Sequence, residues 1–102
     1  MRRVMVRYKV KPDQAARNEE LVRAVYDELR RTQPADMRYA TFRLDDGVTF
    51  VHLHSSEAEG GRNQLAELPA FKAFQAGIAE RCEEAPVVTQ LSEVGSYRFF
   101  EG

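Results

Sequence analysis

The sequence predicts an α+β fold of the split β-α-β type, in which an antiparallel sheet carries two helices on one face. Segments with apolar residues at every second position and segments with helical spacing follow one another in the order β-α-β-β-α-β. An Asp-Gly pair stands between the two middle strands, where a tight turn is needed. The chain has 102 residues, the usual size of one domain, so we expect residues 1–102 to form a single unit.

The composition is that of a globular protein, with 43% hydrophobic and 30% charged residues. Fifteen basic and sixteen acidic residues leave a net charge of −1, so no broad nucleic-acid surface is expected. The basic start has no apolar run of a signal peptide behind it, and no segment has the length of a membrane span. Cys82 is the only cysteine and excludes an intrachain disulfide. We therefore expect a cytoplasmic protein that binds neither nucleic acid nor membrane.

The first half of the chain predicts a strand followed by a long helix. Apolar side chains alternate with polar or longer ones over residues 4–10, which is the period of a strand. Asp13 is a good helix N-cap. Apolar residues then recur at three- and four-residue spacing over residues 21–29. The helix is expected to run to about Thr32, because Pro34 prevents its continuation.

The second half predicts a hairpin, a helix and a closing strand. Two runs rich in β-branched and aromatic residues within 37–54 flank the turn signal Asp46-Gly47. A helical region is expected over roughly 65–83 and a strand over 87–91. A last run, 97–100, is expected to be a further strand or an arm.

The turn also predicts the register of the hairpin, with Asp45 opposite Val48. Directly opposed residues point to the same side of a sheet, and a shift of one residue would exchange the two sides. One side is almost wholly apolar and is expected to carry the helices: Ala40, Phe42, Leu44, Thr49, Val51 and Leu53. The other side mixes rings with polar groups: Tyr39, Thr41, Arg43, Phe50, His52 and His54. Arg7 of the first strand is expected to join this mixed side.

A sheet side that carries both large rings and charges suits neither full solvation nor burial within one chain. We therefore expect the mixed side to be the open face of the sheet and to be covered by a second copy of the chain. Two such faces would form a homodimer and enclose a wet or ligand-filled space between them.

Two segments resemble a known group of proteins. The run 49–57, Thr-Phe-Val-His-Leu-His-Ser-Ser-Glu, followed by 68–74, Leu-Pro-Ala-Phe-Lys-Ala-Phe, is similar to a strand-helix junction of antibiotic-biosynthesis-monooxygenase-like proteins. These belong to the ferredoxin-like dimeric α/β-barrel superfamily. The resemblance implies a dimeric barrel and a relation to cofactor-independent monooxygenases, haem-degrading enzymes and isomerases. The chain contains no Trp, which the monooxygenase and haem-degrading branches often use in the pocket.

The candidate chemistry centres on His52 and His54, the only histidines. A His-x-His pair can supply two metal ligands, but a catalytic metal needs at least one more, and no third ligand can be named, so no metal is predicted. The resemblance to cofactor-independent monooxygenases implies that there is no other cofactor. In the second interpretation a histidine acts as general base, because its pKa lies near neutrality. His52, His54 and Tyr39 are then the catalytic candidates. The residues expected to bind substrate are Arg7, Arg43, Phe50 and Thr41.

Two functional hypotheses remain open at the level of the sequence. The first is a small-molecule enzyme of the monooxygenase-like class that acts on a flat, oxygenated substrate without a tightly bound cofactor. The second is a non-catalytic barrel that binds a metabolite or serves only as an interface. In the second case the polar residues of the mixed side would simply hydrogen-bond within the sheet or across a dimer.

Overall fold

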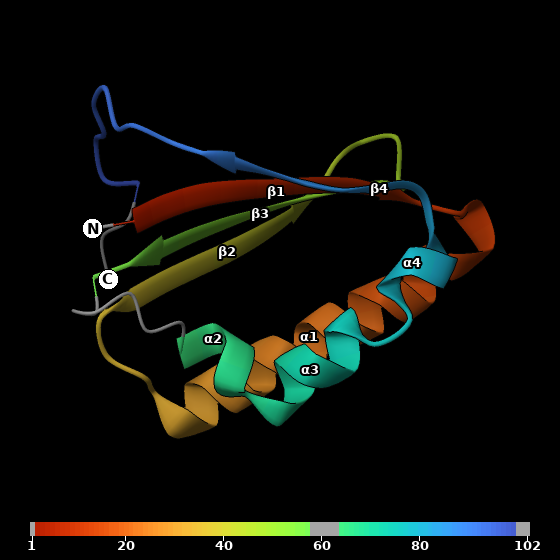
Figure 1. The fold of residues 1–102 in the computed structure, drawn as a ribbon, viewed down its shortest axis with the longest axis horizontal. Coiled ribbons are helices and arrows are strands. Elements are labelled where there is room, and N and C mark those ends of the chain that lie inside the picture. Colours follow the sequence, from red (N-terminus) through yellow and green to blue (C-terminus); the bar gives the residue numbers. More distant parts are fainter. Residues whose placement is uncertain (1, 58–63, 100–102) are drawn as a thin grey trace.

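The computed structural model describes residues 2–57 and 64–99 and confirms the ferredoxin-like α+β class. Its strands are β1 (Arg2–Val10), β2 (Met37–Arg43), β3 (Thr49–Ser56) and β4 (Cys82–Gln90). Its helices are η1 (Pro12–Gln14), α1 (Ala15–Thr32), α2 (Gln64–Glu67), α3 (Pro69–Gln75) and α4 (Ile78–Arg81). The strands form one antiparallel sheet in the order β2-β3-β1-β4. Figure 1 shows the α-helices together on one side of this sheet.

Helix α1 has the predicted periodicity and end, but Asp13 is not its N-cap: Asp13 lies within η1, and Gln14 holds the N-cap position of α1 without a side-chain hydrogen bond. Pro12 opens the short η1 turn, where its missing N–H costs nothing, and α1 continues from it. Val22 and Val25 are buried on its inner face. The helix ends where Gln33 takes a left-handed conformation with φ of 46° and donates its N–H to the carbonyl of Leu29 at 2.8 Å.

The hairpin has the predicted register, with Tyr39 opposite His54 and Thr41 opposite His52. The turn itself differs from the predicted two-residue loop, because the N–H of Gly47 donates to the carbonyl of Leu44 at 3.0 Å and the turn therefore runs from Leu44 to Gly47. The Asp46 carboxylate stabilises the turn by accepting hydrogen bonds from the hydroxyl of Thr49 and from the N–H groups of Val48 and Thr49. These bonds, led by the Thr49 hydroxyl, lower the pKa of Asp46 to about 2. This set of local bonds explains why the register could be predicted from the turn alone.

The assignment of the two hairpin sides, however, was wrong. In the β1–β3 ladder His52 lies opposite Val6 and Phe50 lies opposite Tyr8, so the side with the histidines is the side that faces the helices. The turn determines only which residues share a side. The contact with β1 determines which side is buried, because the inner residues of β1 pack in the core. Phe50 and Tyr8 are 1% and 2% exposed, and their rings stack with centroids 5.6 Å apart.

The predicted second helix is divided into three short helices. Pro69 begins α3, and Gly77 separates α3 from α4 with a φ of 78°, a left-handed conformation that glycine adopts without strain. Strand β4 begins earlier than predicted, at Cys82, so Cys82 and Glu83 belong to the sheet. Among the described residues after Gln90 there is no further strand, and Phe100 lies outside them.

The core lies between the sheet and the helices. It combines residues of β1 and β3 with the inner faces of the helices: Tyr8, Val10, Ala15, Val22, Val25, Phe50, Leu65 and Phe74. No helix in the described part of the chain is long and apolar enough to cross a membrane. The core holds the sheet and α3 at a fixed separation, and beside it this layer contains a cavity.

Candidate functional site

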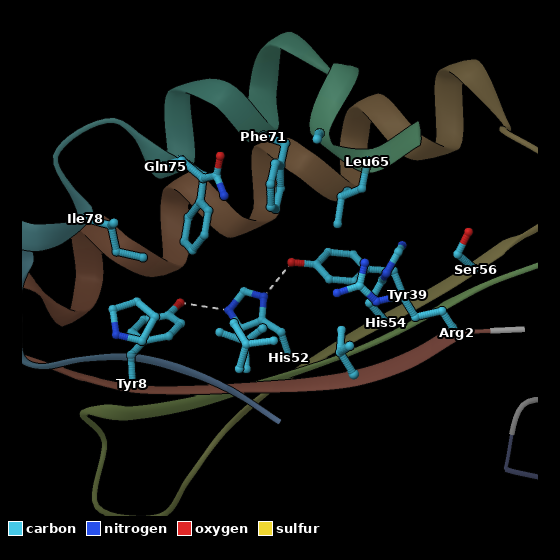
Figure 2. Close-up of a pocket in the computed structure, with 16 residues that line it drawn as sticks. Arg2, Tyr8, Tyr39, His52, His54, Ser56, Leu65, Phe71, Gln75 and Ile78 are labelled. Carbon is cyan, nitrogen blue, oxygen red and sulfur yellow. Dashed lines mark hydrogen bonds between the residues drawn. The ribbon is translucent and has the colours of Figure 1, made fainter. Parts of the chain in front are cut away.

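A cavity of about 720 Å³ lies between the sheet and helices α2 to α4. Its floor is formed by side chains from the first three strands: Val4, Val6, Tyr8, Tyr39, His52 and His54. Its roof is formed by side chains of the short helices: Leu65, Phe71, Phe74, Gln75 and Ile78. Figure 2 shows these two layers facing each other. Val88 of β4 also lines the cavity and is 60% exposed, so the cavity reaches solvent along β4.

His52 occupies the centre of the floor and is 4% exposed. Its Nε2 lies 2.8 Å from the hydroxyl of Tyr8, and its Nδ1 lies 2.5 Å from the hydroxyl of Tyr39 (Figure 2). The hydroxyl of Thr41 is 3.2 Å from the same Nδ1. Both ring nitrogens of His52 are thus engaged by protein groups.

The hydrogen-bonded chain continues behind Tyr8, away from the cavity. The side-chain amide of Asn18, on α1, donates to the Tyr8 hydroxyl at 2.8 Å. The oxygen of the same amide accepts from Nε of Arg81 at 3.1 Å. Asn18 is fully buried and Arg81 is 6% exposed, so these bonds lie in the interior. Arg81 also donates to the carbonyls of Phe74 and Ala76, which hold its guanidinium in place.

Burial shifts the titration of the site toward neutral forms. It lowers the pKa of His52 to about 4, so the ring is uncharged at neutral pH. Burial also raises the pKa of both Tyr8 and Tyr39 well above the ordinary value for tyrosine, so both hydroxyls keep their protons. The site therefore contains neutral donors and acceptors.

His54 is the histidine with an available nitrogen. It lines the cavity, and its Nε2 is buried without a hydrogen-bond partner among the described residues. Burial, and secondarily the charge of Arg2, lower the pKa of His54. The ring packs edge-on against Tyr39 with centroids 6.0 Å apart. A neutral imidazole with a free nitrogen beside a cation can accept a proton and leave an anion near that cation.

The structure brings together some of the predicted site residues and separates others. His52, His54 and Tyr39 share the cavity wall, and Thr41 contacts His52. Arg7 pairs with Val51 on the opposite side of the sheet, so the expectation that it joins the histidines was wrong.

Two further residues that were predicted to bind substrate, Arg43 and Phe50, lie outside the cavity wall. Arg43 donates to the carboxylate of Glu19 at 3.1 Å and to the carbonyl of Gly47 at 2.8 Å, at the far end of the hairpin. Phe50 is a core residue beneath Tyr8 and is absent from the cavity wall. Both residues share the predicted side with His52, but neither contacts the cavity.

Four residues of the site were missed from the sequence. No role in the site was predicted for Tyr8, Arg2, Asn18 or Arg81. Tyr8 had a usable signal, because it is the only residue with a hydroxyl among the inner positions of β1. Asn18 and Arg81 had none, since their partners are 10 and 63 residues away along the chain.

Metal binding finds no support in the described residues, which contain no group of three His, Cys, Asp or Glu side chains able to hold an ion. The two histidines do not form a pair of free metal ligands. Nε2 of His52 is hydrogen-bonded to the Tyr8 hydroxyl, and Nδ1 of His52 lies within hydrogen-bonding distance of the Tyr39 and Thr41 hydroxyls. The donor set around the cavity is instead one of hydroxyls and imidazoles, which suits hydrogen bonding and proton transfer.

Comparison with known proteins finds the same fold in solved structures. No family model matches the sequence, and no curated protein matches it. A crystal structure of an antibiotic biosynthesis monooxygenase superposes with a TM-score of 0.75 over 93% of this chain and 100% of that chain, at 17% identity. A protein from Mycobacterium tuberculosis gives a TM-score of 0.75 over 93% and 96% of the two chains, at 19% identity.

The chain has the fold of the antibiotic biosynthesis monooxygenases. A protein from Pseudomonas aeruginosa also has this fold, with a TM-score of 0.74, 16% identity and coverage of 92% and 94% of the two chains. The similarity extends over nearly the whole of each chain. At these identities the comparison establishes the fold, and the chemistry has to be argued from the cavity.

Proposed function

We propose that this protein is a small-molecule enzyme of the monooxygenase-like class, which acts on a flat, oxygenated, partly apolar substrate without a tightly bound cofactor. The observation that carries this proposal is the cavity with His54 and Tyr39 in its wall. Its volume of about 720 Å³ is typical of sites that hold small organic ligands. The rings of Phe71 and Phe74 in the roof suit a flat molecule.

The geometry distributes the chemical roles differently from the sequence-based expectation. His54 is the candidate base, because its Nε2 has no partner among the described residues. His52 orients Tyr39 rather than touching substrate, because its two nitrogens are occupied. Arg2 supplies a positive charge next to His54, which favours a substrate that becomes an enolate or phenolate.

An oxygenation without a cofactor takes its electrons from the substrate. A CH₂ group that is activated by a conjugated aromatic carbonyl loses a proton to the base, and the carbanion reacts with dioxygen. The carbon ends as a carbonyl, and the second oxygen atom leaves as water, so that R₂CH₂ and O₂ give R₂C=O and H₂O. The base must be unprotonated at the start, which the lowered pKa of His54 ensures at neutral pH.

Internal pairing of His52 favours a second candidate function. Because its hydrogen bonds are satisfied within the protein, the network can also serve simply to hold a rigid pocket that binds a metabolite without converting it. In this case ligands bind but no reaction follows.

The open side of the sheet supports the proposal of a homodimer. Phe42 on β2 is 47% exposed and Val87 on β4 is 62% exposed, and the helices lie on the other side (Figure 1). Tyr97, in the segment after β4, is 82% exposed and helps to line a second hollow of about 500 Å³ with Leu53 and Ser55. A second copy would cover this apolar surface. The cytoplasm remains the expected location.

The enzyme hypothesis is tested with 1,8-dihydroxyanthrone, a flat ketone with an activated CH₂ group. We expect the protein to accelerate dioxygen uptake above the rate in buffer, with one dioxygen consumed per quinone formed. His54→Gln should lower the protein-dependent rate roughly 100-fold, the usual contribution of a general base. Arg23→Gln, on the exposed face of α1, is the matched surface control.

The alternative outcomes separate the two functions. Binding of the anthrone without faster dioxygen uptake would support the non-catalytic pocket. Absence of binding at millimolar concentration would contradict both. An unchanged rate in His54→Gln would remove His54 from its proposed role.

A further inference from the structure

A continuous chain of hydrogen bonds joins the buried cation of Arg81 to the cavity wall. It runs from Arg81 to Asn18, then to Tyr8, His52 and Tyr39, with successive separations of 3.1, 2.8, 2.8 and 2.5 Å. The proposed reaction uses only the cavity end of this chain, at Tyr39. The positions of the protons along the chain follow from its other end.

Arg81 determines the direction of the first two bonds. A guanidinium donates hydrogen bonds and accepts none, so the Asn18 atom next to it is the amide oxygen. The amide nitrogen of Asn18 then faces Tyr8 and donates to its hydroxyl oxygen. Turning this amide over would place its NH₂ group against the guanidinium and leave two donors facing each other.

The bond between Tyr8 and His52 has the same donor-to-acceptor direction as the first two bonds. Its hydroxyl oxygen accepts from Asn18, and its own proton has His52 Nε2 as the remaining partner within the described chain. Leaving a hydroxyl proton unpaired at a residue that is 2% exposed would be costly, so Tyr8 donates to Nε2. The neutral His52 ring therefore carries its proton on Nδ1.

The proton on Nδ1 determines what Tyr39 can offer. The Tyr39 oxygen accepts from Nδ1–H, and its own proton is left for Thr41 or for a molecule in the cavity. We propose that Arg81 and Asn18 act as positioning residues that hold His52 in the Nδ1–H form, so that Tyr39 donates a hydrogen bond to the ligand. This assignment concerns residues that do not touch the ligand themselves.

The direction of these hydrogen bonds specifies a class of ligand. A donor at Tyr39, with the charge of Arg2 in the same cavity, selects a molecule that presents an acceptor oxygen such as a carbonyl, an enolate or a phenolate. Molecules of the same shape without that oxygen are expected to bind less well. This part rests on the proposed function, whereas the proton positions do not.

The proton positions are tested on the ligand-free protein by NMR with ¹⁵N-labelled histidine. Long-range proton–nitrogen correlations distinguish the Nδ1–H and Nε2–H forms of a neutral ring. We expect His52 to be in the Nδ1–H form at pH 7. The substitution Asn18→Asp should reverse the chain, because a carboxylate at this position only accepts: Tyr8 would donate to it, and His52 would become the Nε2–H form.

Two further variants make the NMR result decisive. Tyr8→Phe keeps the ring in place but removes the link, so His52 should lose its preference for one form even if Asn18→Asp fails to fold. Gln90→Glu adds a negative charge at an exposed end of β4 and should leave the wild-type spectrum of His52 unchanged. An Nε2–H ring in the wild type, or the same form in the wild type and Asn18→Asp, would overturn the proposal.

The ligand class is tested with 9-fluorenone and fluorene, which differ by one carbonyl oxygen. For each protein we take the affinity for fluorenone divided by the affinity for fluorene. We expect this ratio to be about 5-fold larger in the wild type than in Asn18→Asp or Tyr39→Phe, which is the effect of one hydrogen bond. Equal ratios in all three proteins would contradict the ligand class. Failure of both probes to bind would contradict the proposed function, while the NMR experiment would still decide the positions of the protons.

Discussion

At His52, two forces act on one side chain and point in the same direction. Removal of the ring from water disfavours its charged form. The two tyrosine hydroxyls suit the neutral form, which needs one donor and one acceptor, whereas a charged ring would need two acceptors. If Tyr8 accepted a hydrogen bond from a charged His52 ring, the Tyr8 proton would lose its acceptor, Nε2 of His52. The network therefore supports the neutral ring.

The lowered pKa of His52 makes the stability of the protein depend on pH. In the unfolded chain the ring takes up a proton near its ordinary pKa of 6.5, whereas in the folded protein it does so near 4. Between these values the unfolded state binds more protons, so the free energy of unfolding decreases as the pH falls from 6.5 to 4, by roughly 3 kcal/mol in total.

The matching experiment compares urea unfolding at pH 7.0 and 4.5 in the wild type and in His52→Gln. We expect the wild type to lose roughly 2–3 kcal/mol more than the variant over this interval. Equal losses in the two proteins would mean that His52 titrates normally in the folded state.

At the scale of elements, the short helix α3 depends on a side chain from α1. Its seven residues are too few for a helix to be stable in isolation, and its N-cap position, Leu68, has no side-chain hydrogen bond. Glu28 of α1 is 8% exposed and accepts a hydrogen bond from the Ala70 N–H at 2.9 Å. This carboxylate from another helix satisfies one of the free donors at the start of α3. Because α3 carries Phe71 and Phe74, Glu28 also holds the roof of the cavity.

Substitution of Glu28 should therefore destabilise the protein more than its place on a charged helix suggests. We expect Glu28→Ala to lower the free energy of unfolding in urea by about 1–3 kcal/mol, because the Ala70 N–H is left unpaired. Glu28→Gln keeps an acceptor oxygen and should cost less. Glu20→Ala, on the exposed side of the same helix, should change stability by no more than about 0.5 kcal/mol. Similar losses for Glu28→Ala and Glu20→Ala would exclude this role.

At the scale of the whole molecule, the sheet has one side covered by helices and one side without them. The described part of the open side carries the charged residues Arg7 and Lys9 together with exposed apolar ones. The site with the histidines lies on the other side, so the homodimer that we propose would leave the cavity intact rather than form it.

This arrangement can be tested by sedimentation. We expect the wild type to sediment as a dimer at micromolar concentration, and Phe42→Glu to sediment as a monomer with unchanged helix content, because a charge would then be buried at the interface. Ala24→Glu, on the exposed face of α1, is the control and should remain a dimer. A wild-type monomer would exclude the homodimer, and a dimeric Phe42→Glu would place the interface elsewhere.

Much of the fold and part of the site followed from the sequence, because those features depend on neighbours along the chain. The periods of β1 and α1, the helix end before Pro34 and the hairpin register all arise from contacts within a few residues. The grouping of Tyr39, His52 and His54 on one side of the hairpin followed from that register. The break at Gly77 and the early start of β4 did not follow from the sequence. The residues around Cys82 can continue a helix or pair with β1, and β1 is distant along the chain.

The sequence by itself determined which residues share a side of the hairpin, and only the tertiary structure decided which side is buried. A turn aligns two strands through local hydrogen bonds, but both sides of an aligned hairpin are equivalent until a third strand and the helices pack against it. Pairing with β1 placed His52 beside Tyr8. Asn18 and Arg81 then came within hydrogen-bonding distance of one another from two separate helices. The open sheet face predicted from the sequence thus became a covered cavity wall.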